Sequence, residues 1–306
     1  MKVLITGASG FIGGHFVKYL HGLNAEIYSL GRTRVDGAIN YSFESLLNIE
    51  SLTKIILKVE PDYCLHLVGS SQENNLQLAF EANTIIGDNL LKAITLAELS
   101  EHTKCLFFGS AAEYGLVHEH DLPISEKYCG SPYNAHGISK LAQTYNTIAW
   151  GRCEGGKVIV VRPFTVLGEK IPKFMAVGNF LNQITSIVNN NKKGELRTGD
   201  LNTARDFIDV DDLVYVCWKL LNSDQAYGKV INICSGESVN IRDILNFMID
   251  FTGVHANVLT SKSKLRSFDM KNHYGDNSHL KKIIGEYEFT HWEESIKKML
   301  NIYGKN

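Results

Sequence analysis

A short β-rich run that leads directly into a glycine-rich turn constrains this chain more than any other feature. Lys2–Thr6 has the composition of a strand, and Gly7, Gly10 and Gly13 follow it in a G-x-x-G-x-x-G pattern that opens a helical segment. Glycines at this spacing let the backbone turn tightly and approach a pyrophosphate, which the N-terminus of a helix stabilises. A glycine-rich turn without a ligand is the alternative, but the flanking strand and helix favour a dinucleotide site.

Strand-like and helical segments alternate through the first half of the chain. They lie, in order, at 2–6, 11–23, 26–30, 46–59, 63–68, 78–98, 104–108, 132–153 and 157–161. This order is typical of βαβ units stacked on a parallel sheet with right-handed crossovers. We therefore expect an α/β fold with a Rossmann-type doubly wound parallel sheet.

After Arg162 the alternation breaks down. Helical patterns remain at 179–189, 209–221, 241–252 and 292–303, with one strand-like run at 230–233. No low-complexity linker precedes them, so a second lobe is expected to be interleaved with the first. We predict a Rossmann lobe of residues 1–165 plus about 206–234, and a smaller C-terminal α/β lobe of about 166–205 plus 235–306.

The composition limits the partners that this protein can have. The 306 residues carry a net charge of −2, with 44% hydrophobic and 21% charged residues, as in ordinary globular proteins. This charge argues against nucleic acid or a membrane surface as a partner, and no apolar run has the length of a membrane span. The six Cys are scattered and the N-terminal residues lack a signal-peptide layout. We expect a reduced, cytoplasmic protein with neither disulfides nor a metal site.

The end of the second strand indicates which dinucleotide binds. An NAD site usually has Asp or Glu there to hold the ribose 2′-hydroxyl, whereas Ser29–Arg34 contains Arg32 and Arg34 and no acid. Two guanidinium groups can bind a 2′-phosphate, although both could also be solvated loop cations. We therefore expect NADP(H) rather than NAD(H), with Asn48 and Ile49 near the adenine.

A second candidate site lies in the stretch Ser131–Lys140. It is expected to begin a long helix with Pro132 in the first turn, where a missing N–H does no harm. His136 and Lys140 are four residues apart and so share a helix face. Ser110 follows an apolar strand and is expected at its carboxyl end, where such sheets bind ligands. Taken alone, Ser110 would be read as a polar turn residue.

These motifs together resemble the extended short-chain dehydrogenase/reductase family, which contains nucleotide-sugar epimerases, dehydratases and reductases. The resemblance covers nearly the whole chain and is carried by the glycine turn and by segments 61–69, 83–90, 109–115, 136–140, 162–164, 204–210, 232–236 and 275–280. The last three, with the Arg32 region, are most similar to the GDP-4-keto-6-deoxymannose reductase branch. The resemblance implies NADP(H) in the Rossmann lobe and a nucleoside-diphosphate sugar in the C-terminal lobe.

The resemblance also implies catalytic roles. The family's Ser or Thr that bonds the reacting oxygen matches Ser110, and the Lys of its Y-x-x-x-K motif, which binds the nicotinamide ribose, matches Lys140. The Tyr that donates the proton is replaced by His136. A His beside Lys⁺ has a lowered pKa, so it is expected to be mostly neutral and a poor acid. Three proton sources stay open: His136, Tyr133 on the same helix face about 10 Å away, or Ser110 with water while His136 orients. A packed His136 in a degenerate site is a further alternative.

Cofactor and substrate contacts follow from the resemblance in the same way. Those expected at the dinucleotide are Gly7, Ser9, Gly10, Phe11, Ile12, Gly13, Arg32, Arg34, Asn48, Ile49, Leu67, Val68, Gly69, Asn83, Lys140, Pro163 and Phe164. Those expected at the nucleotide sugar are Ser70, Glu113, Thr165, Asn179, Arg205 and Arg266. Thr165 replaces a family Asn that contacts the diphosphate. Asn83 could instead be a helix-surface amide, and Arg205 a solvated cation or the partner of a neighbouring Asp.

The residues after Ser110 argue against a dehydratase. Ala111 and Ala112 occupy the positions of the acid and base that remove water, and Glu113, one residue later, would point the other way in an extended segment. We therefore favour an NADPH-dependent reductase of the keto group of a nucleoside-diphosphate 4-keto-6-deoxyhexose, preferably derived from GDP-mannose, in deoxysugar biosynthesis for bacterial-type surface glycans.

Two other functions stay open. One is a nucleotide-sugar 4-epimerase that retains NAD, and the other is a nucleotide-binding protein with altered catalysis. By analogy with relatives, the helices at 78–98 and 132–153 are expected to pair in a homodimer.

Overall fold

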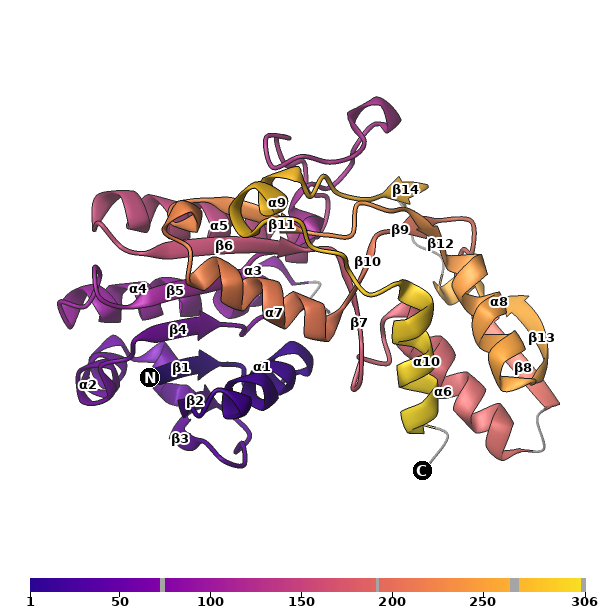
Figure 1. The fold of residues 1–306 in the computed structure, drawn as a ribbon, viewed down its shortest axis with the longest axis horizontal. Helices are drawn as coiled ribbons and strands as arrows, with labels where there is room; N and C mark the ends of the chain where they lie inside the picture. Colours follow the sequence, from indigo (N-terminus) through magenta and orange to yellow (C-terminus); the bar gives the residue numbers. More distant parts are fainter. Residues whose placement is uncertain (72–74, 191–192, 265–269, 304–306) are drawn as a thin grey trace.

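A seven-stranded parallel sheet forms the centre of the protein (Figure 1). The computed structural model describes residues 1–306 except 72–74, 191–192, 265–269 and 304–306. The strands of the sheet are, in spatial order, β11 (Val230–Ile233), β6 (Val158–Pro163), β5 (Lys104–Phe108), β4 (Tyr63–His66), β1 (Lys2–Thr6), β2 (Glu26–Gly31) and β3 (Ile39–Ser42). All neighbouring pairs are parallel. The predicted Rossmann-type sheet is confirmed.

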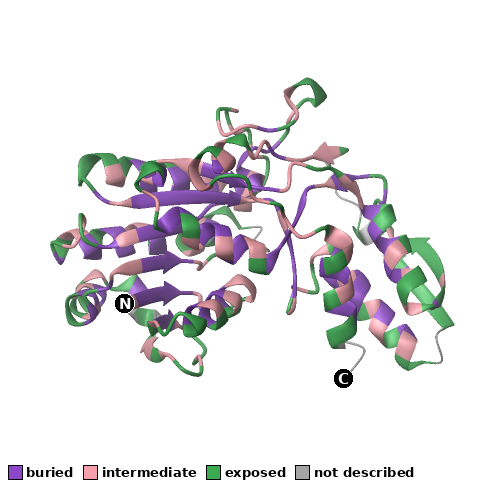
Figure 2. Ribbon diagram, in the orientation of Figure 1, coloured by how far each residue is buried: buried purple, intermediate pink, exposed green. Residues whose placement is uncertain are grey.

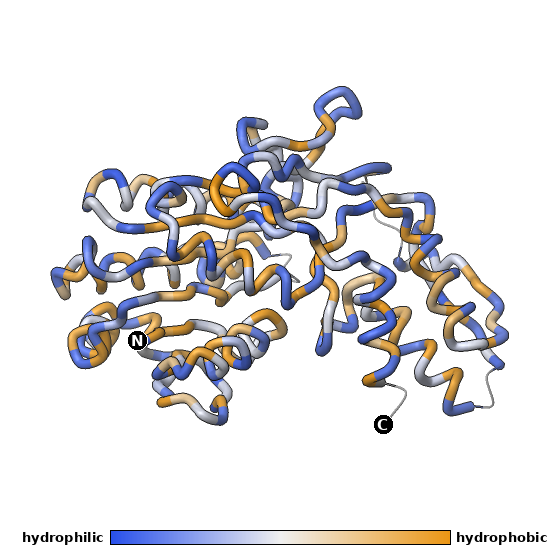
Figure 3. The backbone as a smooth tube through the Cα atoms, viewed as in Figure 1, coloured by the Kyte–Doolittle hydropathy of each residue, from blue (hydrophilic) through white to orange (hydrophobic). Residues whose placement is uncertain are grey.

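Helices cover both faces of this sheet, as a doubly wound fold requires. Helices α1 (Phe11–Gly22) and α7 (Val210–Leu221) share one hydrophobic core with one face. Helices α2 (Ile49–Val59), α4 (Ile86–Leu96) and α5 (Ala135–Cys153) share a second core with the other. The central strands are buried between the two layers (Figure 2) and hydrophobic along most of their length (Figure 3). This is why they appear in the sequence as nearly continuous apolar runs.

Two elements of this lobe differ from the sequence prediction. Strand β3 was not predicted, because it is a short edge strand without buried residues, and edge strands carry a weak apolar signal. The helix predicted at 78–98 consists of α3 (Leu76–Phe80), a π-helical segment (Glu81–Ile85) and α4. The π-helical turn buries the polar side chains of Asn83 and Thr84.

Helix α5 begins later than predicted. Asn134 is its N-cap, with its side-chain oxygen accepting a hydrogen bond from the Gly137 amide at 2.8 Å. Asparagine is among the most favoured residues at this position. Pro132 and Tyr133 therefore precede the helix, and the prediction that Pro132 lies in its first turn is wrong.

The rest of the chain builds a smaller lobe beside the carboxyl ends of β1 and β4 (Figure 1). Its helices are α6 (Ala176–Asn189), α8 (Ile241–Thr252) and α10 (Trp292–Tyr303). They share a third hydrophobic core with residues such as Leu167, Leu196 and Phe207. The remaining strands are short: β7 (Thr165–Leu167), β8 (Lys193–Thr198), β9 (Ala204–Arg205), β10 (Phe207–Asp209), β12 (Val239–Asn240), β13 (His255–Thr260) and β14 (Asn272–His273). Strand β7 pairs with β10, β8 with β13, and β9 with both β12 and β14.

The remaining elements are short. Helix α9 (Ser278–Ile284) packs on the core of α1 and α7, although it falls in the segment expected in the second lobe. Short 3₁₀ helices lie at Phe43–Leu47, Ala111–Glu113, Glu119–Asp121, Asp224–Ala226 and Lys262–Lys264. Across the described ranges, no helix is both long and apolar enough to cross a membrane.

Candidate active site

The glycine turn has the geometry that a pyrophosphate requires. Gly10 is the N-cap of α1, and no side chain caps its amides, so they are left for an anion. Gly7 has φ +78°, and a Cβ there would press on the backbone of Leu67 and Val68 at 3.0 Å. A Cβ on Gly13 would collide with the Gly7 carbonyl oxygen. The turn therefore fits the phosphates of a dinucleotide.

The other residues expected near the phosphates and nicotinamide lie at the start of α1 and directly after β4 and β6. Ser9 is exposed, and Phe11 and Ile12 are half-buried at the start of α1. Leu67, Val68 and Gly69 follow β4, and the Leu67 amide donates to the Thr6 carbonyl at 3.0 Å. Pro163 ends β6, and Phe164 is buried against His273 with ring centres 5.2 Å apart.

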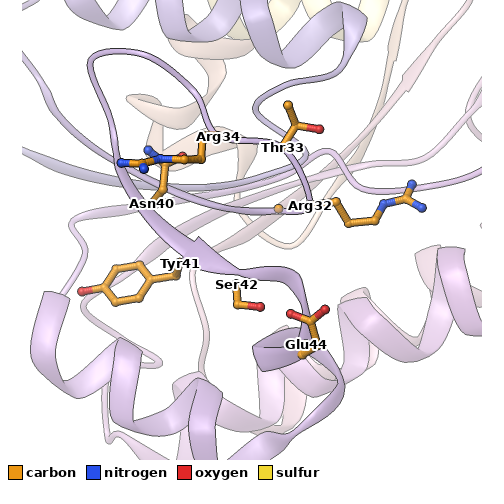
Figure 4. Close-up of a pocket in the computed structure, with 8 residues that line it drawn as sticks. Arg32, Thr33, Arg34, Asn40, Tyr41, Ser42 and Glu44 are labelled. Atoms are coloured by element: carbon orange, nitrogen blue, oxygen red, sulfur yellow. The ribbon is translucent and has the colours of Figure 1, made fainter.

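A cavity of about 420 Å³ lies beyond β2 and β3 (Figure 4). Arg32 and Arg34 both line it, but their side chains extend in opposite directions. Glu44 lines the same cavity. Sequence reasoning missed this acid because it follows β3 instead of β2, and β3 was not predicted. Nearby, Asn48 caps α2, with its side-chain oxygen accepting from the Ser51 amide at 2.9 Å.

Ser110, His136 and Lys140 meet at the carboxyl end of the sheet. Ser110 follows β5, and its hydroxyl oxygen accepts from the Ala112 amide at 3.1 Å. His136 on α5 places Nε2 3.4 Å from Ser110 Oγ and Nδ1 3.0 Å from the Ser70 carbonyl oxygen. Burial and the charge of Lys140 lower the pKa of His136 to about 4. The imidazole is therefore neutral at pH 7, as expected from the sequence.

Lys140 is held in a fixed position on α5, about one helical turn after His136. Its Nζ donates to the Phe108 carbonyl at 2.7 Å and to Gln143 Oε1 at 2.9 Å, and the residue is 5% exposed. Burial lowers the pKa of Lys140 to about 8, partly offset by Glu113. The ammonium form still predominates at pH 7 and supplies positive charge close to His136. Sequence reasoning missed Gln143, whose spacing of three residues from Lys140 on α5 could have indicated it.

Tyr133 lies outside this cluster of helix residues. It precedes α5 and is 42% exposed. The prediction that Tyr133 shares a helix face with Lys140 is wrong, because the Asn134 cap starts the helix only at Ala135. Tyr133 was one of the three possible proton sources, and this correction removes the geometric argument for it.

Glu113 is a structural residue. It ends a 3₁₀ turn, not an extended segment, and is fully buried. Its carboxylate accepts from Arg162 Nε at 2.7 Å, the Ser110 amide at 2.8 Å and Thr144 Oγ1 at 2.9 Å. Burial raises the pKa of Glu113, and Arg162 opposes this shift. The predicted substrate contact is wrong, and this saturated carboxylate cannot serve as the base of a dehydratase.

Asn83 is also buried, contrary to both readings of the sequence. Its side-chain oxygen accepts from the Ser70 amide at 2.7 Å. Its side-chain nitrogen donates to the Ser70 carbonyl at 3.0 Å and to Ser139 Oγ at 2.8 Å. Because Asn83 is 0% exposed, its amide neither contacts a cofactor nor lies on a helix surface. It holds the Ser70 backbone instead.

A second cavity, of about 490 Å³, lies in the smaller lobe and collects three predicted substrate residues. Thr165, Asn179 and Arg205 all line it. Arg205 donates from Nη1 to the carbonyls of Ala204 and Met270 at 2.7 and 2.9 Å. Arg266 lies outside the described residues.

Sequence reasoning missed other residues of this second cavity. The exposed ring of Phe174, the carboxylate of Asp200 and Lys264 line it as well. Lys264 Nζ donates to Asn179 Oδ1 at 2.7 Å and to the Arg197 carbonyl at 2.6 Å. No local pattern marks Lys264, because its partners are distant in sequence.

The model of the NAD dependent epimerase/dehydratase family matches residues 3–234. The chain belongs to this family. It is therefore an NAD(P)-dependent oxidoreductase, and the resemblance to extended short-chain dehydrogenases/reductases is confirmed.

Two similar proteins act on GDP-deoxysugars, according to their names. GDP-6-deoxy-D-talose 4-dehydrogenase of Aggregatibacter actinomycetemcomitans is 30% identical over 100% of this chain and 98% of its own. GDP-6-deoxy-D-mannose reductase of Pseudomonas aeruginosa is 27% identical over 96% of this chain and 92% of its own.

Solved structures agree with this assignment. The structure of RMD from Pseudomonas aeruginosa complexed with NADPH has a TM-score of 0.86 and 26% identity, covering 99% of this chain and 97% of that one. UDP-glucose 4-epimerase of Thermotoga maritima has a TM-score of 0.88 at 21% identity, covering 100% of this chain and 99% of that one. The epimerase shows that the fold is shared.

Proposed function

We propose that this protein is an NADP-dependent reductase of the 4-keto group of a nucleoside-diphosphate 4-keto-6-deoxyhexose, with GDP as the nucleotide, in deoxysugar biosynthesis for bacterial-type surface glycans. The observation that carries the proposal is the cluster of Ser110, His136 and Lys140 beside the glycine turn. The names of the two GDP-deoxysugar relatives support the substrate class.

The protein's own residues would act on the sugar oxygen. A bound dinucleotide supplies the hydride. The Ser110 hydroxyl is the donor next to His136, at 3.4 Å from Nε2, and a ketone that becomes an alkoxide needs such a donor. The Lys140 ammonium stabilises negative charge that develops there. Glu113 is committed to Arg162, and Ala111 and Ala112 carry no ionisable group. The three residues directly after Ser110 therefore supply no acid or base to remove water from the sugar.

The cavity beyond β2 and β3 supports NADP(H) over NAD(H). Arg32 and Arg34 line it and can each contribute charge toward a 2′-phosphate. Glu44 on the same cavity would repel that phosphate but could hold a free 2′-hydroxyl. We expect Arg34→Ala to raise the KM for NADPH about tenfold, with little change in the KM for NADH. We expect Glu44→Gln to lower the KM for NADPH. Equal effects on both cofactors would contradict this choice.

Two further expectations belong to this proposal. We infer a cytoplasmic homodimer in which α4 and α5 pair with their copies. Tyr145 on α5 is 64% exposed and Leu96 on α4 is 63% exposed, which gives these helices apolar surface to bury. Light scattering that gives the mass of one chain at micromolar concentration would refute the dimer.

The reductase is tested by the dinucleotide and the substrate together. We expect the purified protein to oxidise NADPH when GDP-4-keto-6-deoxy-D-mannose is added, with a GDP-6-deoxyhexose as product by NMR. Tightly retained NAD⁺ that is not exchanged during turnover would indicate a 4-epimerase instead. Neither a bound dinucleotide nor turnover of any nucleotide-linked keto sugar would indicate a binding protein.

A further inference from the structure

The contacts of His136 define which of its ring nitrogens carries the proton. Nδ1 lies 3.0 Å from the Ser70 carbonyl oxygen, which can only accept a hydrogen bond. Nδ1 must therefore be protonated for this contact to be favourable. In the neutral imidazole Nε2 then has a free lone pair, and this lone pair faces Ser110 Oγ at 3.4 Å. The neutral ring is thus a proton acceptor on the side of the reacting groups.

The Ser70 carbonyl is fixed by Asn83. The Asn83 side chain bonds both the amide and the carbonyl of Ser70, at 2.7 and 3.0 Å, and it is itself held by Ser139 at 2.8 Å. Ser139 Oγ in turn donates to the His136 carbonyl at 3.0 Å. The π-helical turn at Glu81–Ile85 is what buries Asn83 here, and such turns are often found at functional sites. Asn83 therefore orients His136 without touching it.

We propose that Asn83 is a positioning residue that fixes His136 in the Nδ1–H tautomer through the Ser70 carbonyl, so that Nε2 is the group that takes up the proton of the sugar 4-hydroxyl. This inference rests on the proposed function, because it concerns the same pair of 4-hydroxyl and 4-keto sugars. It assigns His136 as a base in the oxidation direction, with Ser110 as the hydroxyl beside it.

The proton and the hydride balance in both directions. In oxidation, the C4–H bond breaks and its hydride leaves to the oxidised dinucleotide that the proposed function requires. The hydroxyl O–H bond breaks as well, its proton goes to Nε2, and the C4 carbonyl forms beside an imidazolium. In reduction, the imidazolium returns this proton from Nε2 to the oxygen while C4 receives the hydride.

Neighbouring charges favour the neutral ring. Within the described structure, the charged group that acts on the imidazole is Lys140 on the same helix, and Glu113 behind Ser110 acts on Lys140. The Ser70 carbonyl and the Ser110 hydroxyl, which contact the ring from the loops after β4 and β5, are neutral. The neutral His136 imidazole, which is the base for oxidation, is therefore the main form throughout the neutral pH range. The imidazolium, which is the acid for reduction, is a small fraction that decreases further as the pH rises.

The tautomer can be measured without substrate. In protein labelled with ¹⁵N-histidine, the His136 signals are assigned among the 11 His by their loss in His136→Phe. At pH 7 we expect a protonated Nδ1 and an unprotonated Nε2 from their ¹⁵N shifts. A protonated Nε2 in the free protein would overturn the inference. This readout does not depend on turnover, so it separates failure of the inference from failure of the proposed function.

Asn83→Asp tests the positioning role. This variant keeps an acceptor for the Ser70 amide but loses the donor to the Ser70 carbonyl, so we expect the His136 shifts to move toward a mixture of tautomers. Asn89→Asp is the matched control, because Asn89 is a buried amide on α4 that donates to the Leu46 carbonyl at 3.0 Å. Unchanged His136 shifts in a folded Asn83→Asp protein would overturn the role of Asn83. If that variant does not fold, the shifts of the unmodified protein still decide the tautomer.

The pH dependence of kcat/KM in the two reaction directions tests whether His136 carries the proton. Above about pH 6, we expect kcat/KM for oxidation of the GDP-6-deoxyhexose to be flat and kcat/KM for reduction to fall about tenfold per pH unit. His136→Tyr should reverse this pattern, with reduction flat and oxidation rising about tenfold per unit below the Tyr pKa. A flat reduction profile in the unmodified protein would show that another group supplies the proton.

Discussion

His136 and Tyr133 lie close in sequence but differ in what the structure lets them do. His136 contacts Ser110 and the Ser70 carbonyl, whereas Tyr133 is 42% exposed before the helix begins. We expect His136→Phe to slow single-turnover NADPH oxidation by about 10²-fold, as for loss of a general acid, and Tyr133→Phe to leave the rate within about twofold. A fast His136→Phe variant would leave Ser110 and water as the proton source.

The Glu113–Arg162 ion pair gives a stability prediction at the same scale. The two side chains are 0% and 5% exposed, and the charges are 2.7 Å apart. Arg162→Met leaves the Glu113 carboxylate buried without its partner, so we expect a loss of about 3–5 kcal/mol in unfolding free energy. Urea unfolding measures the loss. The double variant Glu113→Gln/Arg162→Met should recover much of it, and equal instability of both variants would contradict this account.

The sequence predicted individual residues well where local spacing decides their position. The pattern placed Ser110 at the end of a strand and His136 on the helix face of Lys140, and the family resemblance grouped the three residues. The sequence could not show that Glu113 bonds Arg162 or that Asn83 bonds Ser70, because these contacts join residues 49 and 13 positions apart. Such pairs depend on how the elements pack, which spacing does not reveal.

Among the elements, the turn into α1 gives the sharpest test of cofactor binding. A Cβ on Gly13 would collide with the Gly7 carbonyl and widen the turn, whereas a Cβ on Gly14 meets nothing within 4 Å. We expect Gly13→Ala to weaken NADPH binding at least about tenfold by fluorescence titration. Gly14→Ala, one residue along the same helix, should leave the Kd unchanged and stabilise the helix by up to about 1 kcal/mol. Similar Kd values for the two variants would contradict the proposed phosphate site.

Elements were predictable where their periodicity is strong and unpredictable where it is interrupted. Helices α8 and α10 lie as expected, at Ile241–Thr252 and Trp292–Tyr303. The late start of α5 depends on one capping bond from Asn134, and the π-helical turn has no residue pattern of its own. Both irregularities lie at the proposed catalytic cluster of Ser110, His136 and Lys140, and local preference commonly yields to function at such sites.

At the scale of the whole molecule, Asp206 joins three segments between the lobes. Its carboxylate accepts from the Ser235 amide and hydroxyl, both at 2.8 Å, from the Gly236 amide at 3.0 Å and from the Gly275 amide at 3.3 Å. The sequence predicts that the two lobes are interleaved. It does not predict that Asp206 bonds the segments between them, because a neighbouring Asp is expected there only as a possible partner of Arg205.

Burial raises the pKa of Asp206 from 3.8 to about 6. The folded state therefore holds a proton that the unfolded state has released, so this group's contribution to stability falls as the pH rises from about 4 to 6. We expect the unfolding free energy of the protein, relative to Asp206→Asn, to fall across this range by on the order of 2–3 kcal/mol. A difference that is constant with pH, measured by urea unfolding, would show that Asp206 is ionised throughout.

Single-turnover reduction of GDP-4-keto-6-deoxy-D-mannose is the most direct test of the central claim. The protein is mixed with NADPH and this sugar, and both NADPH absorbance and the sugar product are followed. We predict one NADPH consumed for each 4-hydroxyl formed, with NADP⁺ released to solution. Conversion of the sugar without loss of NADPH, or loss of NADPH without a new hydroxyl at C4, would contradict the assignment as a 4-keto reductase.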